Sequence, residues 1–218
     1  EMCIRDRYGI SVIDKEKCIR CGKCIHSCPF GAIASKTFIV PVIEALKAGK
    51  HIYAMAAPAT EGQFGVDITM ASWKKAMKEM GFTDFYDVGL GGDMTAAYEA
   101  EEWAEAYKEG NKKVTSCCPA FVNMVRLHYP ELAECVSTTV SPMCAVSRLI
   151  KAKDPEAITV FIGPCVAKKS EVADQKIEGN ADYVLTYSEI RAMMKAKGVE
   201  LQPLSLIHIS EPTRHSLI

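Results

Sequence analysis

The feature that most constrains this chain is a run of four cysteines near its start, with the spacing C-x2-C-x2-C-x3-C-P. They are Cys18, Cys21, Cys24 and Cys28. Spacings this short let one tight loop aim successive thiolates at a single iron-sulfur cluster, because thiolates are the soft ligands that such clusters select. A zinc site is the alternative, but zinc sites usually pair two CxxC knuckles or add histidines. The run therefore predicts a 4Fe-4S cluster.

The spacing matches the bacterial ferredoxin pattern and leaves the role of its fourth cysteine open. In two-cluster ferredoxins the fourth cysteine binds the other cluster, which requires an upstream cysteine set, and only Cys3 lies upstream here. Cys28 thus either closes a one-cluster module or belongs to half of a two-cluster module. The first residue is not methionine, which favours the second alternative. With the apolar residues that flank the run, we expect a ferredoxin-like 4Fe-4S module at residues 9–36.

Composition excludes several classes of function. A net charge of -1 and a hydrophobic content of 49% over 218 residues are typical of a globular protein, without the basic excess of a nucleic-acid-binding protein. The sequence contains no run of about eighteen apolar residues, so no membrane span is predicted. The N-terminus is polar and shows no export signal. Four of the ten cysteines cluster in the run at 18–28 and a long cysteine-free gap follows, which indicates metal ligation in a reducing, cytoplasmic compartment.

The two ends differ from the rest of the chain. Residues 1–8 and 204–218 show no useful periodicity and are similar to translated adapter sequence. We expect them to be a non-native leader and a non-native tail, and the natural protein to be longer at both ends. Neither end is expected to form secondary structure.

From residue 37 the chain alternates between strand and helix patterns. Apolar runs bounded by proline, glycine or polar residues predict strands at 51–57, 85–88, 113–115, 158–162 and 182–186. Helices are predicted between them, including one capped by Asp67, one beginning at Asp93 and one after the Ser141-Pro142 pair. This alternation predicts an α/β fold at residues 37–203, with a mostly parallel sheet flanked by helices.

Four turns follow predicted strands directly, and they are expected to place candidate site residues at one edge of the sheet. They begin at Pro58, Gly89, Cys117 and Cys165, and parallel sheets bind ligands beyond the carboxyl ends of their strands. Cys117 and Cys118 are adjacent, and adjacent thiols rarely bond to each other because the ring is strained. We therefore expect one of the two to bind metal while its neighbour acts as an acid or base.

Two cysteine segments resemble signatures of the iron-only (FeFe) hydrogenases. They are Thr115-Ser116-Cys117-Cys118-Pro119 and Pro164-Cys165-Val166-Ala167-Lys168-Lys169-Ser170-Glu171. The ferredoxin-type run matches the family's usual electron-input module, and the resemblance spans about residues 10–204. It implies an incomplete hydrogenase large-subunit fold. The family's hydrogen cluster is a 4Fe-4S cube joined through a cysteine to a two-iron subsite that carries carbonyl, cyanide and a bridging dithiolate.

The resemblance also implies roles for single residues. Cys118 and Cys165 would bind the cube, and Cys117 would exchange protons with the amine of the dithiolate. Lys168 would donate to one cyanide, and Ala57 and Pro58 would border the other.

The implied proton relay runs from the Cys117 thiol through Glu99, Glu102 and Ser137 to solvent. The two glutamates lie three residues apart on a predicted helix and can share one face. On the residues alone, a solvated acidic face and a plain loop hydroxyl are the alternatives.

The chain departs from the family's commonest form at several positions. Phe121, Gly163 and Met143 replace tryptophan, methionine and glutamine, and Cys144 is an additional thiol. These changes indicate a divergent subgroup. The third cysteine signature, which supplies the other two cube ligands, has no match here, so we expect the chain by itself to be inactive.

The function implied for the parent protein is the reversible reduction of protons to hydrogen, with electrons from ferredoxin or another redox protein. Hydrogen and protons would be its substrates. Two other functions remain open: a hydrogen or redox sensor built on the same site, and a hydrogenase-like iron-sulfur assembly protein without the two-iron subsite.

Overall fold

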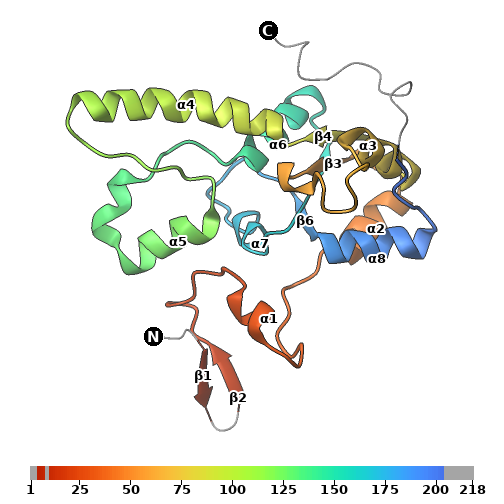
Figure 1. Cartoon of the computed structure of the whole chain (residues 1–218), viewed down its shortest axis with the longest axis horizontal. Coiled ribbons are helices and arrows are strands. Elements are labelled where there is room, and N and C mark those ends of the chain that lie inside the picture. Colours follow the sequence, from red (N-terminus) through yellow and green to blue (C-terminus); the bar gives the residue numbers. More distant parts are fainter. Residues whose placement is uncertain (1–3, 8–9, 204–218) are drawn as a thin grey trace.

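A four-stranded parallel sheet forms the centre of the computed structural model, which describes residues 4–7 and 10–203 (Figure 1). Its strands are β3 (Ile52–Ala56), β4 (Asp84–Asp87), β5 (Ile158–Gly163) and β6 (Tyr183–Thr186), in the order β4-β3-β5-β6. Ala54 of β3 pairs with Phe85 on one side and Val160 on the other. The central strands β3 and β5 are almost entirely buried, as expected for a parallel sheet covered on both faces.

Helices pack on both faces of the sheet. Core residues of α2 (Ile39–Lys47), α3 (Met70–Glu79) and α8 (Tyr187–Lys197) join one apolar cluster with Ala54, Val160 and Leu185. On the other face, Met143, Val146 and Ile150 of α6 (Pro142–Lys153) pack with Met55 and Phe161. The long helix α4 (Gly89–Lys108) contacts α6 and extends away from the sheet (Figure 1). The sheet thus positions the turn that carries Cys165, which follows β5 directly.

The remaining elements are short. They are η1 (Pro58–Thr60), α5 (Pro119–His128), η2 (Pro130–Cys135) and α7 (Lys168–Glu171). In the N-terminal module, β1 (Ile4–Arg7) pairs with β2 (Ile10–Ile13) as an antiparallel hairpin, and α1 (Lys23–Ser27) follows. Figure 1 shows this module as a separate lobe beside the sheet.

The N-terminal hairpin differs from what the sequence suggested, because residues 4–7 form β1 inside the segment expected to lack structure. The expected tail at 204–218 lies outside the described residues. The domain boundaries and the non-native origin of both ends stay predictions. Over the described chain, no helix is long and apolar enough to cross a membrane.

Three predicted elements were wrong in detail. Thr69, not Asp67, caps α3, because its hydroxyl forms a reciprocal capping box with Ser72. Helix α4 begins at Gly89 rather than Asp93, since the Asp87 carboxylate accepts the Gly89 N–H at 2.7 Å. The strand expected at 113–115 is a single bridge between Val114 and Val136.

A close helix contact explains one glycine at the start of α4, Gly91. A Cβ at Gly91 would lie 2.2 Å from the Pro142 carbonyl oxygen, so a side chain there would push α4 away from α6. Gly91, part of the glycine-rich run that suggested a turn, therefore serves helix packing.

Candidate active site

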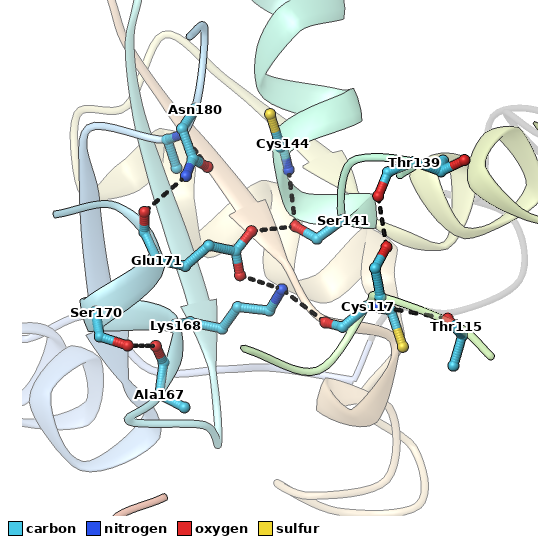
Figure 2. Close-up of polar contacts among 12 residues, drawn as sticks. Thr115, Cys117, Thr139, Ser141, Cys144, Ala167, Lys168, Ser170, Glu171 and Asn180 are labelled. Atoms are coloured by element: carbon cyan, nitrogen blue, oxygen red, sulfur yellow. Dashed lines mark hydrogen bonds and ion pairs between the residues drawn. The ribbon is translucent and has the colours of Figure 1, made fainter. Parts of the chain in front are cut away.

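The Lys168 side chain joins the two cysteine segments. Its ammonium donates to the Cys117 backbone carbonyl at 3.1 Å and to the Glu171 carboxylate at 2.7 Å (Figure 2). The side chains of Lys168 and Glu171 are only 11% and 7% exposed. Lys168 reaches this position because α7 follows directly on the turn after β5. The turn that carries Cys165 and the segment that carries Cys117 are thereby held together.

The Glu171 carboxylate has a second donor on its other oxygen. The Ser141 hydroxyl donates to it, and the same hydroxyl oxygen accepts the Cys144 N–H at 3.4 Å as the N-cap of α6 (Figure 2). The Asn180 side chain donates to the Glu171 carbonyl at 3.0 Å. Glu171 thus connects α7 to α6 and fixes the lysine that faces Cys117.

Glu99 of α4 lies against the residues that precede Cys117. Its carboxylate accepts the Thr115 hydroxyl at 2.9 Å and the Ser116 N–H at 3.1 Å. The Cys117 N–H in turn donates to the Thr115 hydroxyl oxygen at 3.3 Å. A chain of hydrogen bonds therefore runs from Glu99 to the Cys117 backbone through one threonine.

Glu102 faces the neighbouring segment one helical turn further along α4. It accepts the Thr138 N–H at 3.2 Å and also the Thr138 hydroxyl. Burial raises the pKa of Glu102, but hydrogen bonds from Ser137 and Thr138 outweigh that effect and leave the pKa below its ordinary value. The Ser137 hydroxyl oxygen also accepts the Thr139 N–H at 3.0 Å. Glu99, Glu102 and Ser137 thus lie along one polar strip.

The predicted cube ligands, Cys118 and Cys165, lie in the two segments that Lys168 joins. Cys118 is the N-cap of α5, with Pro119 in the first helical position. Its thiol and that of Cys117 are exposed, and Cys165 is half-buried. Ala57 is buried at the end of β3, where its N–H donates to the Ile162 carbonyl at 2.9 Å, and Pro58 begins η1.

A cleft of about 770 Å³ is lined by residues of both the N-terminal module and the α/β domain. Polar groups of the site line one side of it, including Ser116, Ser137, Ser141 and Glu171. Cys18 and Arg20 of the module line the other side. Volumes of this order are typical of sites that hold small molecules or cofactors.

Comparison with known proteins identifies the family. Residues 50–217 match the family described as iron only hydrogenase large subunit, C-terminal domain, and residues 11–34 match the 4Fe-4S binding domain. This chain belongs to the iron-only hydrogenase family. The fold class and the family's cofactors, a 4Fe-4S cluster and the hydrogen cluster, are therefore confirmed.

Individual hydrogenases show the same relationship. Iron hydrogenase 1 of Clostridium pasteurianum is 31% identical over 88% of this chain and 45% of its own length. The periplasmic Fe hydrogenase large subunit of Nitratidesulfovibrio vulgaris is 32% identical over 91% of this chain and 61% of its own length. The chain thus spans less than two thirds of these curated relatives.

A solved hydrogenase structure and one protein of another function complete the comparison. The FeFe-hydrogenase HydA(deltaEFG), a structure concerned with stepwise H-cluster assembly, aligns with a TM-score of 0.66 and 25% identity over 75% of this chain and 48% of that chain. The cytosolic Fe-S cluster assembly factor NAR1 of Kluyveromyces lactis is 34% identical over 79 residues, 36% of this chain and 17% of its own length.

The module's cysteines suit the cluster that the iron-only hydrogenase family implies. All four are free thiols with at least partial exposure. Backbone N–H groups of Ala32, Phe30, Ile33 and Gly31 surround the Cys28 sulfur and lower its pKa despite some desolvation, which favours the thiolate that binds iron. Within the described residues, no three His, Cys, Asp or Glu side chains already stand together as a metal site. The donor set of the module fits a 4Fe-4S cluster, and the ligand roles of Cys118 and Cys165 stay predictions.

Several contact residues were not assigned a role from the sequence. Thr115 and Thr138 hold the two glutamates, while Glu171 holds Lys168 and Ser141 holds Glu171. The i,i+3 spacing of Lys168 and Glu171 was a local signal for one of these pairs. The others join segments that are distant in the sequence.

Proposed function

We propose that this chain is the electron-input and proton-handling part of an iron-only hydrogenase that interconverts protons and hydrogen. The observation that carries the proposal is the Lys168 bridge, which reaches from the turn of Cys165 to the backbone carbonyl of Cys117. It brings two segments with the family's cysteine signatures to the carboxyl edge of one parallel sheet. Structural stability alone does not require both cysteine motifs to meet there.

The cysteines divide into an input group and a site group. Cys18, Cys21, Cys24 and Cys28 would hold the 4Fe-4S cluster that accepts electrons from ferredoxin or another redox protein. Cys118 and Cys165 would hold part of the hydrogen cluster, which supplies the iron chemistry of hydrogen when it is bound. Lys168 would orient that cluster through a charge-assisted hydrogen bond, with Ala57 and Pro58 at its other side.

The protein's own groups would move the proton. The Cys117 thiol serves as the acid and base nearest the cluster, and a positioned group of this kind contributes about 10²–10⁴-fold to a rate. Glu99 lies behind it, linked to the Cys117 segment through Thr115. Glu102, held by Thr138 and by Ser137, continues the path toward solvent.

The chain by itself is proposed to be inactive. Cys118 and Cys165 are two thiolate donors, and a cube held by protein thiolates needs four. The parent enzyme is proposed to work in an anaerobic cytoplasm with ferredoxin as its electron partner.

A second candidate function is iron-sulfur cluster assembly. The match to the assembly factor NAR1 supports it over about a third of the chain, 36%. Cys117 favours the hydrogenase, because a protein that only carries a cluster needs no thiol for proton transfer.

Infrared spectroscopy of the complete parent protein, coexpressed with the hydrogenase maturation proteins, distinguishes the two. A hydrogenase is expected to show bands from iron-bound carbonyl and cyanide and to evolve hydrogen from reduced ferredoxin. Iron loading without those bands would leave only the assembly protein.

A further inference from the structure

Two consecutive lysines of α7 serve different sides of the molecule. Lys168 faces the candidate active site, whereas Lys169 turns toward the link between the module and the domain. The Lys169 ammonium donates to the Ser35 hydroxyl at 3.0 Å, to the Lys36 carbonyl at 2.9 Å and to both oxygens of Glu189 at 2.8 and 2.9 Å. The side chains of Lys169 and Glu189 are 7% and 13% exposed. The lysine thus places its three donors on three separate acceptor groups.

Glu189 is itself held firmly at the start of α8. It accepts the Thr186 N–H at 2.7 Å as part of a capping box. Burial raises the pKa of Glu189, but hydrogen bonds from Lys169, Thr186 and Thr37 outweigh it and keep the pKa below its ordinary value. The carboxylate is therefore charged and fixed, and it gives Lys169 a rigid anchor.

Lys169 and Glu189 hold the segment that joins the cysteine module to the α/β domain. Residues 35–37 connect the cysteine module to α2, and each of these three residues bonds to the Lys169–Glu189 pair. No apolar side chain of lysine's size could bond to Ser35, Lys36 and Glu189 together. The pair therefore holds the segment through which the module joins the domain.

The cysteine loop of the module rests directly on the turn that carries Cys165. Gly22 has a positive φ of 76°, and a Cβ there would lie 2.2 Å from the Val166 side chain. The Asn123 amide of α5 donates to the Ile19 carbonyl of the same loop at 3.4 Å. Val166 follows Cys165 immediately. A small shift of the module would therefore separate the cysteine loop from this turn.

We propose that Lys169 is a positioning residue that locks the cysteine loop of the 4Fe-4S module against the Cys165 turn. Its purpose rests on the proposed function, in which electrons pass from the module to a cluster at Cys165. Buried ion pairs give little net stability compared with apolar packing, so orientation is the better explanation of a buried lysine here. Sites of this kind work only when supporting residues hold them closely in place.

Hydrogen exchange in the whole chain, with its 4Fe-4S cluster reconstituted, tests the position directly. In Lys169→Met we expect backbone amides in peptides covering residues 17–26 and 33–40 to exchange at least about ten-fold faster than in the wild type. Lys195→Met removes an exposed lysine from α8 and is expected to leave both peptides unchanged. Unchanged exchange in Lys169→Met would overturn the proposal.

A double variant separates positioning from simple stabilisation. Lys169→Met with Glu189→Gln leaves no unpaired buried charge and keeps a capping side chain on α8. We expect its Tm to return toward that of the wild type while exchange in the two peptides stays fast. If exchange slowed together with the recovery of Tm, Lys169 would be only a stabilising residue and the proposal would fail. Neither readout depends on hydrogen turnover, so a negative result here would not contradict the proposed function. Conversely, absence of the infrared bands would not contradict the positioning role of Lys169.

Discussion

The Lys168 ammonium lies 2.7 Å from the Glu171 carboxylate, with both side chains buried. This pair joins the two cysteine segments, because the same ammonium also donates to the Cys117 carbonyl at 3.1 Å. The Ser141 hydroxyl supports the carboxylate from α6. The position of the Cys117 thiol therefore depends on a charge pair that contains no cysteine.

Lys168→Met should destabilise the chain. The change leaves the Glu171 carboxylate buried with Ser141 as a remaining side-chain donor, and breaking a buried pair costs about 3–5 kcal/mol. We expect the free energy of unfolding, measured by urea denaturation, to fall by about 3 kcal/mol. Lys176→Met, at an exposed lysine, should change it by less than about 0.5 kcal/mol. Equal free energies of unfolding for the two variants would show that the Lys168–Glu171 pair does not stabilise the fold.

Glu99→Gln in the complete parent protein should slow hydrogen turnover by about 10²-fold, because the glutamine amide still accepts hydrogen bonds but cannot take up and release a proton. Glu101→Gln is the matched control, since Glu101 lies on the same helix and is exposed. Equal rates in the two variants would remove Glu99 from the relay. Both variants should keep the infrared bands of the hydrogen cluster.

The sequence predicted those parts of the fold that depend on local pattern. The apolar runs at β3 and β5 identify buried strands because strands covered on both faces need apolar residues throughout. Ser141-Pro142 identifies a helix start because the hydroxyl and the missing N–H act within one turn. The cysteine signatures are local in the same way.

Some errors arose from local caps, at Thr69 and Asp87, and others where tertiary contacts decide. Glycines at the start of α4 resemble a turn, and only the approach of Gly91 to Pro142 shows why the helix needs a glycine at position 91. The Ser141–Glu171 contact joins residues 30 apart, so no local pattern reveals it. The roles of Glu99, Glu102 and Ser137 stay predictions, although these residues lie along one strip.

Stability should depend on pH through Glu189. Its pKa in the folded chain lies below the ordinary value of 4.5, so the folded state binds fewer protons than the unfolded state near that pH. The stabilisation is complete above pH 4.5 and is lost as the pH falls through the folded pKa. The difference in unfolding free energy between wild type and Glu189→Gln should therefore shrink as the pH falls below 4.5. Glu200→Gln controls for the loss of one exposed negative charge, and a difference independent of pH would contradict the prediction.

Anaerobic reconstitution of the chain with iron and sulfide should load about four irons, the content of one 4Fe-4S cluster. Cys21→Ser should lose most of this iron, whereas Cys135→Ser should keep it because Cys135 lies outside the cysteine run. No hydrogen should form from a strong reductant. About eight irons per chain, or robust hydrogen evolution, would show that a second cube forms here.

Cys117→Ala in the complete parent protein tests the division of labour between the two adjacent cysteines. If Cys117 is the proton-exchanging thiol and Cys118 the ligand, removing the Cys117 thiol should abolish turnover while the carbonyl and cyanide bands remain. Lys168 bonds to the Cys117 backbone carbonyl, which alanine retains, so the segment should keep its position. Cys135→Ala controls for loss of a half-buried thiol and should leave both readouts unchanged. Loss of the bands in Cys117→Ala would make Cys117 a cluster ligand, and full turnover would remove it from the proton path.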